Sequence, residues 1–196
     1  MISWFKSLPE KDIDYSEWSP FIKSTWIRRN FMKFVYLLMG ILFISPDFLK
    51  YNNFKNQISN TIFTFINNSN LAYIASALCN ILIILTIYFL HEFLHIVVIY
   101  KKCDLSITYN GGVFLWITPN AIMPKRQFWL YMTLPIIGLS IAPSIISAFM
   151  NGYLKSLLLY ICWVNLVIAS ADIINSILIL MKPNNTLFYR GYYRHE

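Results

Sequence analysis

The sequence predicts an all-α membrane protein with four transmembrane helices and one short β-hairpin. Hydrophobic residues make up 57% of the 196-residue chain and charged residues only 13%, which is far from the composition of a soluble globular domain. Four apolar stretches approach or exceed the roughly 20 residues that a membrane-spanning helix needs. Between the second and third of these stretches, Asn110-Gly111 separates two runs of β-branched and aromatic residues, a strong local signal for a hairpin.

Composition divides the chain into three parts. We expect residues 1–29 to form a cytoplasmic or interfacial segment and residues 30–181 to form a four-span membrane domain. Residues 182–196 are expected to form a basic, aromatic cytoplasmic tail. The first part has no early apolar core and no small-residue cleavage site, so we expect no removable secretory signal. Ser19 and Pro20 predict a helix start, as N-cap and first helical residue. This helix either lies on an anionic membrane surface or leads directly into the first span.

The predicted spans cover residues 31–48, 71–100, 128–150 and 154–181. A short amphipathic segment is expected within 50–70, because apolar residues there follow helical spacing. Prolines interrupt the third span, which membrane helices tolerate where neighbouring groups satisfy the freed backbone.

Lysine and arginine cluster at the N-terminus, in 101–126 and in the tail. The positive-inside rule therefore predicts a multi-pass protein of a cell membrane, with both termini and the hairpin loop in the cytoplasm. The net charge of +7 is scattered around apolar spans, which argues against a nucleic-acid partner. The three cysteines include no CxxC pair, so neither a disulfide framework nor a cysteine-zinc site is indicated.

The second span carries an HExxH pattern that begins at His91 and ends at His95. On a helix these two imidazoles lie one turn apart on one face, a spacing that lets both bind one zinc ion. In zinc peptidases the glutamate at the position of Glu92 takes a proton from a metal-bound water. The same pattern can also be two surface histidines. The membrane setting favours zinc, because an ionisable side chain inside a span costs about 2.5 to 3.5 kcal/mol and usually has a use.

The fourth span supplies a candidate for the third zinc ligand, since a carboxylate oxygen is one of the standard choices. Asp172 is the only acidic residue in the four spans besides Glu92 and the terminal Asp47. On an unbroken helix Asp172 shares one stripe with Asn165, Asn175 and Ser176. The alternative is that Asp172 only forms an interhelical hydrogen bond. Asn80, nearly three turns before His91, is likewise either a support of the site or an interhelical hydrogen-bonding residue.

With these motifs the chain resembles the site-2 protease class of intramembrane metalloproteases, in which one helix supplies HExxH and a later helix an aspartate. It is more similar to the zincin peptidase family of small bacterial membrane proteins, from His91 to about residue 189. The resemblance implies His91, His95 and Asp172 as zinc ligands and Glu92 as the catalytic base.

Two positions qualify that resemblance. Site-2 proteases usually carry Asp-Gly, whereas here Asp172 is followed by Ile173 in what we expect to be an unbroken apolar helix. Asn165 falls near the place of that class's substrate-positioning asparagine, which implies the same role here.

Two functions follow from these observations. The first is a membrane-embedded zinc metallopeptidase that hydrolyses membrane-associated proteins or peptides near the cytoplasmic face. The hairpin edge then holds the substrate by strand addition, unless the hairpin region is a plain connecting loop. The second is a non-catalytic zinc-binding or partner-binding membrane protein, for example one giving immunity to a membrane-active peptide. Three ligands and an open position favour the first function, and four closed ligands the second.

Overall fold

The computed structural model describes residues 2–5, 14–45, 48–66, 68–100, 105–109 and 115–195. The chain forms two compact units. Unit 1 comprises Met1–Phe34, Glu92–Leu134 and Asp172–Glu196, and unit 2 comprises Val35–His91 and Pro135–Ala171. The boundaries between the units fall inside helices, so single helices contribute residues to both.

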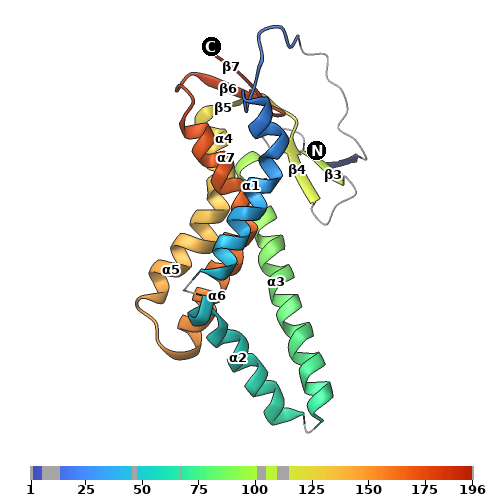
Figure 1. Cartoon of the computed structure of the whole chain (residues 1–196), viewed down its shortest axis with the longest axis vertical. Coiled ribbons are helices and arrows are strands. Elements are labelled where there is room, and N and C mark those ends of the chain that lie inside the picture. Colours follow the sequence, from blue (N-terminus) through green and yellow to red (C-terminus); the bar gives the residue numbers. More distant parts are fainter. Residues whose placement is uncertain are drawn as a thin grey trace. The chain divides into compact units, whose positions relative to one another are not determined.

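Helices account for most of the described chain (Figure 1). They are α1 (Thr25–Ile44), α2 (Phe48–Phe65), α3 (Ser69–Ile99), α4 (Lys125–Ile136), the π-helix η1 (Ile137–Ile141), α5 (Ala142–Ser147), α6 (Gly152–Ile168) and α7 (Ser170–Leu180). Two stretches are long and apolar enough to cross a membrane, α3 and the continuous run Lys125–Ser147, and the bent pair of α6 and α7 is a third candidate. The mostly helical architecture is thus confirmed, with two or three helical stretches apolar enough to span a membrane in place of the four predicted spans.

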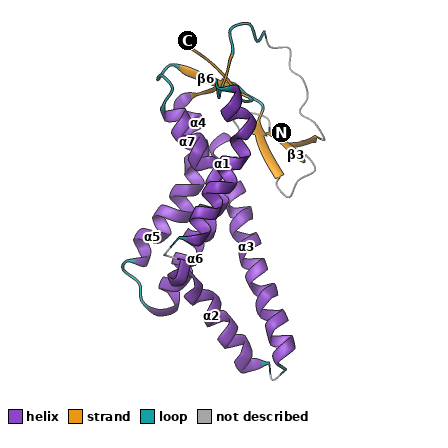
Figure 2. Ribbon diagram, in the orientation of Figure 1, coloured by secondary structure: helices purple, strands orange, loops and turns teal. Residues whose placement is uncertain are grey.

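Two small sheets contain the described strands, all of which belong to unit 1 (Figure 2). In the first sheet β1 (Ile2–Phe5) runs parallel to β3 (Leu105–Tyr109), and β3 pairs antiparallel with β4 (Leu115–Pro119). The antiparallel β3–β4 pair confirms the predicted hairpin after the HExxH helix. Its Asn110-Gly111 turn lies outside the described residues.

The second sheet was not predicted. It has the order β2 (Ser19–Pro20), β7 (Tyr192–His195), β6 (Thr186–Tyr189) and β5 (Met123–Pro124), and all its pairs are antiparallel. The C-terminal tail is therefore a hairpin. Its turn is Arg190-Gly191, with φ of 44° and 82°, as the twist of a two-residue hairpin requires.

The predicted helix start at Ser19 and Pro20 is wrong, because these residues form the edge strand β2. Proline is tolerated there since an edge strand has one unpaired side. Helix α1 begins at Thr25 instead, and the Ser24 hydroxyl accepts the backbone N–H of Ile27 at 3.4 Å. Ser24 is thus the residue that caps the helix.

Aromatic side chains from the tail complete the core of unit 1. Phe188 and Tyr193 are buried with Phe21 and Ile179, and the Phe21 and Phe188 rings meet edge to face with centroids 5.7 Å apart. Burial of such rings attaches the tail to the core of unit 1.

Unit 2 is built around the packing of α2 on α6. Its buried cluster contains Phe54 and Ile58 from α2, Ile87 from α3, and Tyr160, Trp163 and Val164 from α6. Asn80 accepts a hydrogen bond from the Tyr160 hydroxyl at 3.5 Å and donates to the Ser76 carbonyl at 2.8 Å. These contacts match the interhelical alternative for Asn80.

The predicted unbroken helix over 154–181 is wrong, because the chain bends by 66° between α6 and α7. The Ser170 hydroxyl donates to the Val167 carbonyl at 2.8 Å, and serine side chains that bond nearby carbonyls in this way often bend helices. The bend also ends the predicted common stripe of Asn165 and Asp172. Asp172 now lies in the first turn of α7, where the free N–H groups of a helix stabilise a carboxylate.

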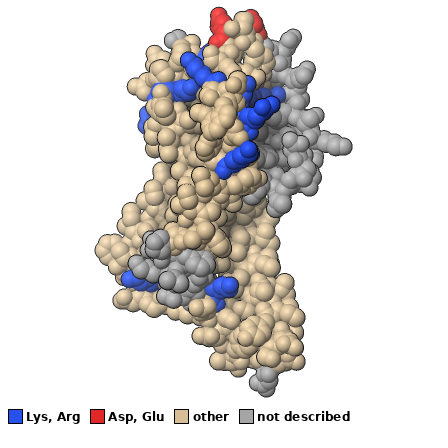
Figure 3. All heavy atoms as spheres, in the orientation of Figure 1, with Lys and Arg blue, Asp and Glu red and all other residues tan. Residues whose placement is uncertain are grey.

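Charge is unevenly divided between the units. All Lys and Arg residues except Lys50, Lys55 and Lys155 belong to unit 1. The face drawn in Figure 3 shows basic side chains gathered over part of the surface and broad areas without charge. Helix α3 also has a largely apolar surface, since it exposes Leu78, Leu82, Phe89 and Phe93 among others.

Candidate metal centre

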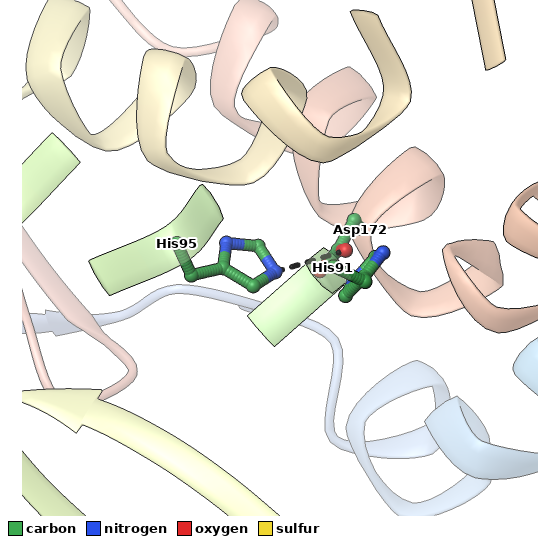
Figure 4. Close-up of side chains that lie close together, drawn as sticks. All are labelled: His91, His95 and Asp172. Atoms are coloured by element: carbon green, nitrogen blue, oxygen red, sulfur yellow. Dashed lines mark ion pairs between the residues drawn. The ribbon is translucent and has the colours of Figure 1, made fainter. Parts of the chain in front are cut away.

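His91, His95 and Asp172 are the group of His, Cys, Asp and Glu side chains that could hold a metal ion within the described part of the chain. Each residue offers one ligand atom, and these atoms all lie within 4.8 Å of one another (Figure 4). His91 and His95 lie one turn apart on the continuous helix α3. The structure thus brings together the three residues that the sequence predicts as ligands.

The pair formed by His95 and Asp172 already has the spacing of two zinc ligands. His95 Nε2 lies 3.3 Å from Asp172 Oδ2, and their side chains are only 6% and 13% exposed. Two donors about 2.1 Å from a tetrahedral zinc ion lie about 3.4 Å apart. Two imidazoles and one carboxylate are also a donor set that catalytic zinc uses. The residues present therefore fit this metal.

The other nitrogen of His95 is held by the protein. His95 Nδ1 lies 2.7 Å from the backbone carbonyl oxygen of Tyr131 in α4. Because a carbonyl only accepts hydrogen bonds, Nδ1 must be the donor, and in the neutral ring Nε2 keeps its lone pair. The residue four positions after Tyr131 is Pro135, which has no N–H to donate to the Tyr131 carbonyl.

His91 is held in a similar way by a side chain. His91 Nδ1 lies 2.9 Å from Asn165 Oδ1, and Asn165 on α6 is fully buried. Asn165 therefore contacts a predicted metal ligand. Its predicted role in positioning the substrate stays a prediction.

Glu92 follows His91 directly on α3 and is half-buried. A helix places successive side chains about 100° apart, so Glu92 flanks the face that carries the two histidines. Its predicted role as catalytic base stays a prediction.

Sequence reasoning missed Tyr131, Pro135 and Ser140 as neighbours of the site. One signal was available for Tyr131, because a proline inside a predicted span has no N–H to donate to the carbonyl four residues earlier. Ser140 gave no such signal. Its contact with Asn165, 2.7 Å to Nδ2, depends on how α6 packs against η1.

Comparison with known proteins gives one match. No curated protein and no solved structure matches the chain. A family described as "Putative zincin peptidase" matches residues 83–187, just over half of the chain. The matched region contains the HExxH motif, the β3–β4 hairpin and Asp172. The chain therefore belongs to the zincin peptidase family.

Proposed function

We propose that this protein is a membrane-embedded zinc metallopeptidase that hydrolyses peptide bonds of membrane-associated proteins or peptides near the cytoplasmic face. The observation that carries the proposal is the convergence of His91, His95 and Asp172 beside Glu92. Among the described residues this group has three members, and three protein ligands leave a fourth zinc position open for water or substrate.

The roles of the side chains follow from their chemistry. His91, His95 and Asp172 would hold the metal, which when bound lowers the pKa of water to about 7 and stabilises negative charge on a carbonyl oxygen. Glu92 accepts the proton of the attacking water and delivers it to the amine that leaves. Burial of both histidines keeps bulk water from competing for these contacts.

Helix lengths support a site close to one membrane face. His91 lies eight residues before the end of α3 at Ile99, and Asp172 lies eight before the end of α7 at Leu180. Each distance corresponds to about 12 Å along a helix. Because nearly all Lys and Arg residues belong to the same unit as both helix ends, the positive-inside rule places these ends in the cytoplasm.

Helix α1 completes four spans in this proposal. Its 20 residues correspond to about 30 Å, the thickness of the hydrocarbon core. Leu37, Ile41 and Ile44 are exposed along it, as expected for a lipid-facing surface. Both termini then lie in the cytoplasm.

The hairpin supports a way to hold the substrate. In the order β1-β3-β4 the strand β4 lies at an edge, and an edge strand can pair with an extended peptide. We propose that the substrate binds to β4 in this manner.

The test is the substitution Glu92→Gln, with Glu17→Gln as a control that makes the same change at an exposed glutamate. Cells that produce wild-type protein should contain new N-termini of membrane proteins, detected by proteome-wide N-terminal labelling. These should vanish with Glu92→Gln and persist with Glu17→Gln, while purified Glu92→Gln keeps its zinc. Identical products from wild type and Glu92→Gln would end the proposal. Zinc without new N-termini in any variant would favour the non-catalytic alternative.

A further inference from the structure

We infer that Asn165 and Pro135 are positioning residues that fix the ring tautomer of both histidines, so that each presents Nε2 to the metal. This inference rests on the proposed metal site, but it concerns metal affinity and does not require peptidase activity. Five hydrogen bonds between buried groups carry it, and their directions follow from the backbone carbonyls in the network, which can only accept.

The orientation of the Asn165 amide follows from its neighbours. Asn165 Nδ2 lies 3.1 Å from the Pro135 carbonyl oxygen and 2.7 Å from Ser140 Oγ. The Pro135 carbonyl can only accept, so the amide nitrogen must face it. Asn165 Oδ1 then faces His91 Nδ1.

The protonation of His91 follows from that orientation. An amide oxygen only accepts, so His91 Nδ1 carries the proton and donates across the 2.9 Å contact. In the neutral imidazole Nε2 then holds a lone pair, the form that binds zinc. Partners of this kind typically change metal affinity by about 10- to 100-fold.

Ser140 holds the far side of the amide. Its hydroxyl accepts from Asn165 Nδ2 and donates to the Cys162 carbonyl at 3.3 Å, so both functions of the hydroxyl are used. Ser140 lies in the π-helix η1, where the Ala142 N–H bonds the Ile137 carbonyl five residues earlier. Such π-turns occur mainly as single turns and frequently at functional sites.

Pro135 acts on both histidines. Its carbonyl accepts from Asn165, which orients His91. Pro135 also has no N–H to donate to the Tyr131 carbonyl, which accepts from His95 Nδ1 at 2.7 Å. Pro135 thereby affects the hydrogen bonding of both histidines.

The experiment compares Asn165→Ala and Pro135→Ala with two matched controls, Asn80→Ala and Pro143→Ala. Asn80 is another buried asparagine of unit 2, and Pro143 is another buried proline of the same span. Purified variants in detergent are titrated with zinc against a chelator of known affinity, and thermal unfolding of the metal-free proteins is recorded. Neither measurement uses a substrate.

Asn165→Ala should raise the zinc Kd by about 10-fold or more, whereas Asn80→Ala should leave the zinc Kd within about twofold. Pro135→Ala should weaken zinc binding while raising the melting temperature of the metal-free protein, because the restored N–H repairs the helix and competes with His95 for the Tyr131 carbonyl. A merely structural residue would change stability and affinity in the same direction.

Equal zinc Kd values for Asn165→Ala and Asn80→Ala would overturn the inference. If Asn165→Ala does not fold, Ser140→Ala provides the test. Loss of one hydrogen-bond partner of the Asn165 amide should still raise the zinc Kd by several-fold. Wild-type protein that binds zinc and cleaves nothing would contradict only the proposed function.

Discussion

His95 Nε2 lies 3.3 Å from Asp172 Oδ2, although the two side chains belong to different helices, α3 and α7. Without a metal this contact is a buried ion pair, which requires the protonated imidazole in which both ring nitrogens donate. With zinc it is one edge of the coordination tetrahedron. The metal content of the protein separates these alternatives.

Substitution of either residue should remove the metal. Purified wild-type protein is expected to hold stoichiometric zinc by elemental analysis, and His95→Ala and Asp172→Ala should each lose most of it, because two remaining ligands bind zinc weakly. His195→Ala changes a histidine of strand β7 and should keep the metal. Equal zinc in all four proteins would exclude the site.

Metal removal should destabilise the protein through mass action. A ligand present at 100 times its Kd stabilises the folded state by about 2.7 kcal/mol, so a chelator should lower the melting temperature of the wild type. The same chelator should leave the melting temperature of His95→Ala nearly unchanged, which thermal unfolding in detergent will show. A similar decrease in both proteins would mean that the chelator acts elsewhere.

Lys125 should stabilise the end of the helix that carries Asp172. Its ammonium donates to the carbonyl of Leu180 at 3.2 Å and also to the carbonyl of Lys182. Leu180 is the last residue of α7 and Lys182 lies two residues beyond it, at the helix end where a cation also interacts favourably with the helix dipole. We expect Lys125→Met to cost about 1 to 2 kcal/mol of unfolding free energy, measured by thermal unfolding.

The adjacent Arg126→Met provides the control, because it removes the same charge from the same turn of α4. A loss of stability as large as that of Lys125→Met would show that net charge, and not the capping contact, is responsible.

Tyr193 should titrate at a lower pH than ordinary tyrosines. Burial by itself raises its pKa, but hydrogen bonds and charges from Lys23 and Lys182 outweigh burial and lower the pKa. Lys182 Nζ lies 3.9 Å from the centre of the Tyr193 ring. The phenolate absorbance that Tyr193→Phe removes should appear below pH 10, and Lys182→Met should move it upward.

The sign of the stability effect follows from the same shift. With a depressed pKa, the folded state releases the Tyr193 proton before the unfolded state does. The unfolding free energy of the wild type, relative to that of Tyr193→Phe, should increase as pH rises through the folded pKa, up to about pH 10. This extra stability is lost when the pH falls back through the folded pKa. If the difference in unfolding free energy between the wild type and Tyr193→Phe does not change across this alkaline range, the lysine contacts do not lower the pKa of Tyr193.

Local patterns predicted those features that depend on neighbours along the chain. The spacing of His91 and His95 determines that they share a helical face, whatever that helix packs against. Asn-Gly between two β-branched runs likewise predicts a hairpin from a few residues, and β3 pairs with β4 accordingly.

Features that depend on distant residues were not predicted. Strand β2 has two residues and exists only because it pairs with Tyr192 and Tyr193. The bend at Ala169 also escaped prediction, because a serine often bends a helix when its hydroxyl bonds a carbonyl of the preceding turn, and the sequence does not show whether that bond forms.

The sequence by itself determined the helical, apolar character of this protein and the set of side chains able to bind zinc, since composition and helical periodicity act over short distances. Tertiary structure decided which of those side chains meet, and through which nitrogen each histidine is held. That decision depends on the Tyr131 carbonyl and the Asn165 amide, whose hydrogen bonds exist only once α3, α4 and α6 have packed.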